Sequence, residues 1–231
     1  MKRFWREVAV EPAGTGWQVA LDGRRVKTAQ VRAQVVPTGA LGEALADEWR
    51  AQAEDVNPAG FVLRDMADYA IDIVAVDPAD AIRRILAYAE SDTLCYRAEP
   101  DEPLAARQRA AWEPLLKAAE QAYAVRFERV AGILHRPQPT ETLAALRTRL
   151  ETLDPFTLAA LHTLASLAAS LVIGLAALEP GADAEALFAA SNLEEDWQAE
   201  QWGLDYEAEA TRARKLATFA SAARFAILAR G

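Results

Sequence analysis

Cysteine and histidine are scarce in this chain, and that scarcity narrows the chemistry it can support. The 231 residues include one cysteine, Cys95, and two histidines, His135 and His162. A single cysteine excludes an internal disulfide framework and a zinc site built on several thiolates. Neither histidine has a partner at metal-ligand spacing, and no histidine is paired with Cys95 in the sequence. We therefore expect no metal, no cofactor and no reactive thiol.

Motifs for phosphate binding and for hydrolysis are also absent. The sequence has no long glycine-rich phosphate loop, no G-x-S-x-G and no H-E-x-x-H. The short run Gly14-Thr15-Gly16 precedes a predicted strand, whereas a dinucleotide-binding loop would open a helix. These absences argue against an enzyme.

Positive charge is in the minority. Asp and Glu number 34 against 25 Lys and Arg, so the formal net charge is −9. This balance argues against nucleic acid and against anionic lipid as the main partner. The first ten residues, MKRFWREVAV, lack the apolar run of a signal peptide. We expect a cytosolic protein with some preference for basic partner surfaces.

The longest stretch without formal charge, residues 156–178, is the segment around which we expect the chain to fold. Its 23 residues are long enough for a membrane span, but Thr157, His162 and Ser170 are among the polar residues spread along it. Asp154-Pro155 before it and Glu179-Pro180-Gly181 after it are typical helix boundaries. The pattern favours one buried helix at the centre of a helical domain over a membrane span.

The N-terminal part has a different pattern. Residues 3–36 alternate apolar and polar positions, with a hairpin signal at Asp22-Gly23 and a further short strand at 33–36. Thr38 can cap a helix that carries Leu41, Leu45 and Trp49 on one face. Asn57-Pro58 interrupts the chain. We expect an α+β, mostly α protein, with a β-rich domain at 1–58 and a larger helical bundle at 59–231.

An acidic stripe follows this boundary. Asp65, Asp68 and Asp72 lie off the apolar face of the predicted helix at 63–74. Such a stripe is usually a solvated helix face. The alternative is a contact surface for a basic partner, and on that interpretation Asp72 is a candidate partner-binding residue.

The densest constellation of acidic and aromatic residues is SNLEEDWQAEQWGLD at 191–205. Ser191 and Glu194 fit a capping box at a helix start, and Trp202-Gly203 fits a helix end. Asp205 can cap the last helix, which is expected to bury Leu216, Phe219, Ala223 and Ile227. Capping does not explain the crowding of the remaining residues, which are typical of a protein interface. The candidate partner-binding residues are Glu195, Trp197, Gln198, Trp202, Asp205 and Asp72.

Two other classes of function stay open on these residues alone. A carboxylate-based hydrolase would use a pocket lined by Glu195 and Asp205 as an acid/base pair. A small-molecule-binding helical protein could use the same region. Adjacent helical positions point about 100° apart, so Glu194 and Glu195 would not converge on one bond.

Short motifs run through nearly the whole chain. They lie at 3–8, 16–24, 26–28, 35–38, 48–52, 70–72, 91–98, 138–139 and 193–205. Their order and spacing resemble a known family, the assembly chaperones that hold the α subunit of the ATP synthase catalytic head. The family often has a Gly-Ser pair where this chain has Ala169-Ser170.

The resemblance implies a chaperone without catalysis that binds the free α subunit and shields its β-contacting surface until the catalytic head assembles. It also implies that the acidic residue at the position of Glu195 matters for function. We expect a monomer in the bacterial cytoplasm, with eukaryotic relatives in the mitochondrial matrix.

Overall fold

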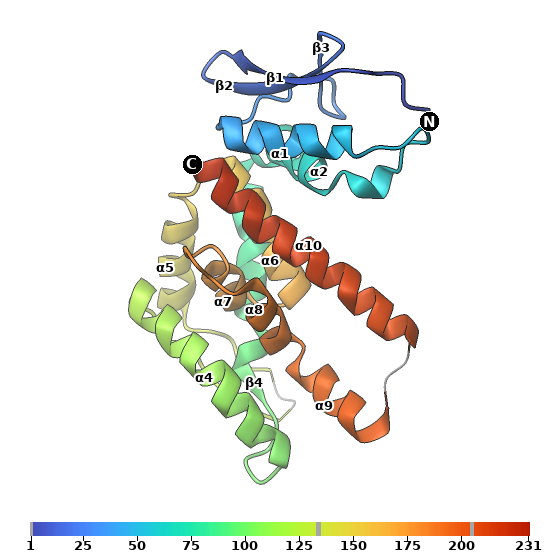
Figure 1. Cartoon of the computed structure of the whole chain (residues 1–231). Helices are drawn as coiled ribbons and strands as arrows, with labels where there is room; N and C mark the ends of the chain where they lie inside the picture. The colour runs from blue at the N-terminus through green and yellow to red at the C-terminus, as the bar shows by residue number, and fades with distance from the viewer. Residues whose placement is uncertain (1, 133–134, 204–205) are drawn as a thin grey trace. The chain divides into compact units, whose positions relative to one another are not determined.

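The computed structural model describes residues 2–132, 135–203 and 206–231. The chain forms two compact units. The first comprises 1–81, 154–160 and 224–231, and the second comprises 82–153 and 161–223. The mostly helical α+β class is confirmed, with strands first and helices after them (Figure 1). The boundary expected at residue 58 stays a prediction about independently folding domains.

A small antiparallel sheet opens the first unit. Its strands are β1 (Val8–Ala13), β2 (Gly16–Leu21) and β3 (Arg24–Arg25), in the order β1-β2-β3. Asp22 and Gly23 join β2 to β3 with φ of +47° and +75°. Positive φ at both positions is the signature of a type I′ hairpin turn, so the predicted hairpin is confirmed. The predicted strand at 33–36 is present only as the isolated bridges Trp17–Val36 and Lys27–Ala33.

Helix α1 (Gly39–Arg50) packs on this sheet (Figure 1). Thr38 caps it as predicted, because its Oγ1 accepts a hydrogen bond from the N–H of Leu41 at 3.0 Å. Leu41 and Leu45 are fully buried and Trp49 nearly so, which confirms the predicted apolar face. Helix α2 (Val62–Tyr69) follows, continues into a π-helical turn at Ala70–Val74, and precedes α3 (Pro78–Glu90).

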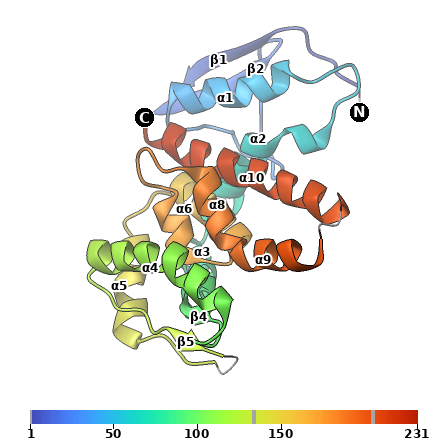
Figure 2. The same ribbon diagram turned by 60° about the horizontal axis from the view of Figure 1, so that its bottom comes forward.

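Helices dominate the second unit. They include α4 (Pro103–Tyr123), α5 (Thr140–Leu150), α8 (Ala184–Ser191), α9 (Leu193–Trp202) and most of α10 (Tyr206–Arg230). The short strands β4 (Tyr96–Arg97) and β5 (Val130–Ala131) pair in parallel (Figure 2). Each of these strands is only two residues long.

The apolar segment at 156–178 is buried as expected, but it is not one helix. Helix α6 (Pro155–Ala168) ends where Ala169 takes a φ of +46°. Ser170 then caps α7 (Leu171–Ala176), with its hydroxyl accepting from the N–H of Ile173 at 3.1 Å. A residue with positive φ cannot continue a right-handed helix, so the expectation of one continuous helix is wrong. Within the described residues, no helix combines the length and apolar character needed to cross a membrane.

The inner face of α10 also differs from the expectation. Phe219 and Ala223 are buried as predicted, whereas Ile227 is 49% exposed. Phe225 is fully buried in its place, which shows that the buried face is shifted around the helix near its end.

Candidate partner-binding site on helix α9

Helix α9 starts differently from the predicted capping box. Ser191 is the last residue of α8, and its hydroxyl donates to the carbonyl oxygen of Phe188 at 2.7 Å. Asn192 occupies the N-cap position of α9 without a side-chain capping bond. The prediction that Ser191 and Glu194 cap each other is therefore wrong. Three acidic residues in the first turn, beginning with Glu194, still lie where the helix dipole favours negative charge.

Glu194 instead joins α9 to α4. The buried side chain of Gln108 donates from Nε2 to Oε1 of Glu194 at 2.6 Å. The Oε1 of Gln108 accepts from the N–H of Ala98 at 2.8 Å. One buried amide thus connects α4, α9 and the residue after β4. Because both polar ends of Gln108 are satisfied, this contact fixes the position of the first turn of α9.

Arg107 supports the middle of α9 from the same helix. Its Nη1 forms an ion pair with the carboxylate of Glu200, at 2.7 and 2.9 Å to the two oxygens. Its guanidinium carbon lies 4.4 Å from the centre of the Trp197 ring. This geometry is a cation–π contact. Trp197, a predicted partner residue, is therefore half-buried under Arg107 and anchors the helix.

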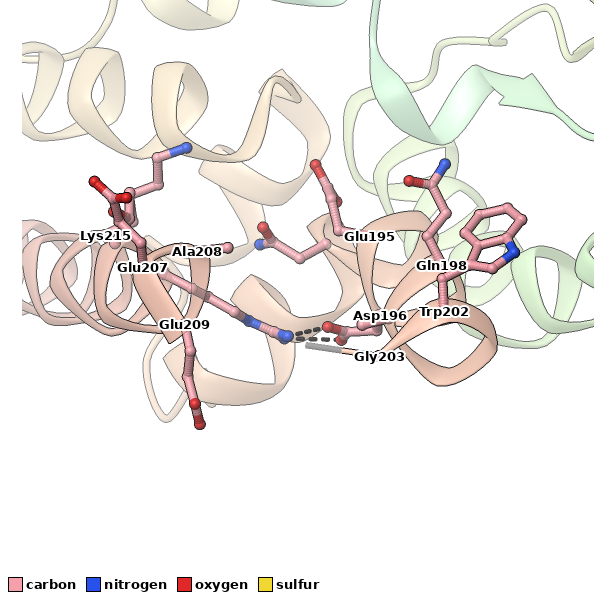
Figure 3. Close-up of a pocket in the computed structure, with 13 residues that line it drawn as sticks. Glu195, Asp196, Gln198, Trp202, Gly203, Glu207, Ala208, Glu209 and Lys215 are labelled. Atoms are coloured by element: carbon pink, nitrogen blue, oxygen red, sulfur yellow. Dashed lines mark hydrogen bonds and ion pairs between the residues drawn. The ribbon is translucent and has the colours of Figure 1, made fainter. Parts of the chain in front are cut away.

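Helix α10 holds the third contact. Arg212 forms a bidentate ion pair with Asp196, and the bond from Nη2 to Oδ2 is 2.8 Å (Figure 3). Planar pairing of this kind fixes direction as well as distance. Glu194, Asp196 and Glu200 thus each have a basic or amide partner in the second unit.

Three of the predicted residues lie on the opposite, exposed face. Glu195, Gln198 and Trp202 stand at i, i+3 and i+7, so they share one side of α9. All three line an open hollow of about 660 Å³ between α9 and α10. Glu195 and Gln198 extend to the same side of α9 (Figure 3). Trp202 is 81% exposed, which is unusual for the largest apolar side chain.

The hollow carries more negative than positive charge. The opposite charges of Asp196 and Arg212 cancel in their ion pair. Apart from this pair, the lining residues include three carboxylates, Glu195, Glu207 and Glu209, and one cation, Lys215. The α9–α10 face therefore combines an exposed indole with excess carboxylate, a combination suited to a partner that offers an apolar pocket rimmed by basic groups.

The helix ends at Trp202, as predicted. The N–H of Gly203 donates to the carbonyl oxygen of Ala199 at 2.9 Å, and Gly203 takes a φ of +92°. Its ψ of 158° places it outside the left-handed helical region that glycine often adopts at a helix end. Asp205, the sixth candidate residue, lies outside the described residues, so its pairing with Glu195 as an acid/base pair is not tested.

Asp72 has a different environment. It belongs to the first unit and is 6% exposed. Its two carboxylate oxygens accept from the hydroxyl of Thr28 at 2.8 Å and from the N–H of Gln30 at 3.0 Å. Asp68 accepts from the N–H of Ala29 at 3.1 Å in the same way. Asp68 and Asp72 thus hold the loop at 28–32, whereas Asp65 pairs with Arg64. Asp72 has little surface to offer a partner.

Burial shifts the pKa of the single cysteine and of His162. Cys95 is fully buried, and this burial raises the pKa of its thiol to about 12, which keeps it protonated. Burial also lowers the pKa of His162. Among the described residues, His, Cys, Asp and Glu do not form a cluster of three or more that could hold a metal ion.

Comparison with known proteins assigns the family. The family model of the ATP12 chaperone protein matches residues 2–120, about half of the chain. The crystal structure of Atp12 from Paracoccus denitrificans superimposes with a TM-score of 0.93 at 37% identity, covering 99% of this chain and 98% of the other. This chain belongs to the ATP12 chaperone family. The resemblance described from the sequence, to assembly chaperones of ATP synthase, is thereby confirmed.

Two further relatives match this family member over most of its length. A solved structure from Agrobacterium tumefaciens matches with a TM-score of 0.93 at 39% identity, covering 100% of this chain and 86% of the other. The mitochondrial protein atp12 of Schizosaccharomyces pombe is 25% identical over an alignment of 214 residues that covers 87% of this chain and 74% of that protein. The two solved structures cover 99% and 100% of this chain, so those two matches extend beyond residue 120 and include the α9 region.

The residues that hold α9 in place were not predicted from the sequence of this ATP12-family chain. Arg107 and Gln108 lie 93 and 86 residues before their partners on α9, and Arg212 lies 16 residues after Asp196. Gln108 is a polar residue that lies one turn before Trp112, on the buried side of α4. Its acceptor could not be found without the fold.

Proposed function

We propose that this chain binds the free α subunit of the ATP synthase catalytic head and covers the surface that α later presents to β. The chain carries out no catalysis in this proposal, and it acts in the bacterial cytoplasm as a monomer. The binding face is formed by Glu195, Gln198 and Trp202. Trp197 supports that face from beneath, and Asp205 remains a predicted neighbour.

One observation carries this proposal. Trp202 is 81% exposed on a helix whose other face is fixed by Gln108 and Arg107. Exposing a tryptophan to water costs apolar burial that the fold could otherwise gain. Tryptophan beside a charged residue is typical of the few residues that dominate binding energy at interfaces. A rigid support under it reduces the entropy lost on binding.

The physical need for such a chaperone follows from the client. In the assembled head, α alternates with β across large obligate interfaces, and surfaces of this kind are apolar and aggregate when they are exposed alone. A protein that covers one of them transiently and then yields to β needs shape and moderate affinity rather than chemistry. The α9 face, small and acidic with one indole, fits that requirement.

Co-purification tests the proposal. The tagged chain is expressed in a bacterial host together with α alone, with β alone, or with both, and the captured subunit is quantified by mass spectrometry. We expect α to be enriched over β when both are present, and free α to stay soluble only when the chaperone is present. Equal capture of α and β, or capture of neither by a folded bait, would contradict the proposal.

A further inference from the structure

A second hollow in the helical unit has the opposite charge. It lies between α4 and the β4–β5 pair and has a volume of about 460 Å³. Four cationic side chains and one carboxylate line it. They are Arg97, Arg109, Lys117 and Arg129, with Glu113. In a chain of net charge −9 this concentration of positive charge is out of proportion to the composition.

The cations are only partly neutralised. Arg129 is paired on two sides, by Glu113 at 3.0 Å and by Glu120 at 3.2 Å. Arg97 shares Glu113 at the longer distance of 3.4 Å, and its Nε is buried without a hydrogen-bond partner. Arg109 and Lys117 are exposed and form no hydrogen bond or ion pair with the described residues.

Burial and repulsion act together on Arg97. Its guanidinium lies 5.2 Å from the centre of the Trp112 ring, and its side chain is 12% exposed. Burial lowers its pKa, and the nearby charges of Arg129 and Arg109 act in the same direction, against Glu113. An anion that entered the hollow would offset this repulsion and could accept from the unpaired Nε.

The spacing of the unpaired cations indicates the shape of that anion. Arg109, Glu113 and Lys117 follow one another at intervals of four on α4, so they form one stripe. Eight residues separate Arg109 from Lys117, which is about 12 Å along a helix. Residues i and i+4 of an extended chain lie about 13 Å apart, and their side chains point to the same side. A single phosphate group could not reach both cations.

We infer that the hollow lined by Arg97, Arg109 and Lys117 binds an extended, acidic polypeptide segment with carboxylates at i and i+4. This inference rests on the proposed function in one respect, since we place the segment on the captured client. Small side chains at Ala98, Ala105 and Ala131 leave room for a peptide backbone. The site is separate from the acidic α9–α10 face and complements it in charge.

Peptide titration tests this inference directly. The probe is a fluorescein-labelled nonapeptide of glycine and serine with glutamate at its third and seventh positions. The comparison peptide has glutamates at the third and fourth positions, which point to opposite sides. We expect the first peptide to bind at least fivefold more tightly, and added salt to weaken it. Equal binding of the two peptides would overturn the inference.

The variant Arg109→Glu/Lys117→Glu should weaken the first peptide at least tenfold. A matched control, Arg136→Glu/Arg147→Glu, makes the same charge change at exposed positions outside the hollow and should stay within twofold. Unchanged binding by a folded Arg109→Glu/Lys117→Glu variant would overturn the inference. So would tripolyphosphate binding at concentrations where the peptide does not bind, because the ligand would then be a polyphosphate.

Capture of α separates the failure of this inference from the failure of the proposed function. We expect Arg109→Glu/Lys117→Glu to retain less α than the wild type. If the wild type captures no α, the proposed function fails, and the peptide titration still decides the present inference. If the wild type and the variant capture α equally and bind the peptide equally, only the present inference fails.

Discussion

Two clusters of polar residues in the second unit differ in the partners of their hydrogen bonds. At the junction of α6 and α7, Asp92 is fully buried, and its oxygens accept from the N–H groups of Leu94 and Val172, both at 3.0 Å. On α9, Glu195 and Gln198 are exposed beside Trp202 and line a hollow. Both groups lie in motifs that resemble the chaperone family, yet only the second faces outward.

This difference separates residues that maintain the fold from residues that serve a partner. Asp92 closes the start of α7 together with the buried hydroxyl of Ser170, so its chemistry is used within the chain. The exposed α9 residues add little to stability, because water satisfies their polar groups in the free protein. Substitutions in the two regions should therefore affect different measurements.

The largest expected effect is on stability. Asp92→Ala leaves the buried N–H groups of Leu94 and Val172 without an acceptor, at a cost of about 1–3 kcal/mol each. We expect the free energy of unfolding in urea to fall by about 3 kcal/mol or more. Glu195→Ala is the control from the other region and should change it by less than about 0.5 kcal/mol. Similar losses in both variants would contradict the comparison.

Trp202→Ala should have the reverse profile. Truncating an interface tryptophan typically costs about 2 kcal/mol or more of binding, which is roughly a 30-fold weaker Kd for α. The melting temperature should stay within about 2 °C, since the side chain is largely exposed. A clear drop in melting temperature with unchanged α binding would show that Trp202 serves the fold.

The pH dependence of stability tests the role of the buried residue Asp92 in this comparison. Burial raises the pKa of Asp92 from 3.8 to about 6. The folded state thus binds this proton more tightly than the unfolded state, and Asp92 favours folding most below about pH 4. Its contribution falls as pH rises from about 4 to about 6, by an amount on the order of 3 kcal/mol.

Urea unfolding of the wild type and Asp92→Asn across pH 4 to 7 measures this contribution. We expect the stability advantage of the wild type over Asp92→Asn to shrink as pH rises through that window. An advantage that grows with pH would show that hydrogen bonding to the carboxylate outweighs its burial.

The smallest expected effect is a gain. Ala169 takes a φ of +46° at an exposed position, which costs an L-residue about 1–2 kcal/mol. Ala169→Gly removes this strain but increases the entropy of the unfolded chain, so we expect a net stabilisation of about 0.5–1 kcal/mol. Ala168→Gly, at the buried last residue of α6, should destabilise instead. A loss of stability in Ala169→Gly would contradict the assigned conformation.

Local signals in the sequence predicted much of the fold. The turn at Asp22-Gly23 and the cap at Thr38 depend on neighbouring residues, and both were predicted correctly. The break at Ala169 was missed because alanine is a strong helix former, and only the resemblance to a Gly-Ser pair pointed to it. The misassigned Ser191–Glu194 box has the same origin, since a local partner was expected where Gln108 supplies a distant one.

In the candidate site, too, features set by neighbouring residues can be predicted and those set by distant residues cannot. The exposed residues Glu195, Gln198 and Trp202 could be selected from one short segment, because their spacing alone places them on one face. Their support by Arg107, Gln108 and Arg212 depends on tertiary contacts that no local pattern encodes. The charge pattern makes Asp72 a candidate, but its burial by the loop at 28–32 depends on tertiary contacts that spacing does not show.

A titration of purified, labelled α subunit with the wild type, Glu195→Lys and Glu90→Lys tests the central claim most directly. Glu90 is the exposed last residue of α3, so the control makes the same charge change away from the α9–α10 face. We predict that Glu195→Lys raises the Kd for α at least tenfold while Glu90→Lys stays within twofold, with all three proteins unfolding at the same temperature. Wild-type affinity in a folded Glu195→Lys variant would contradict the assignment of this face as the α-binding site.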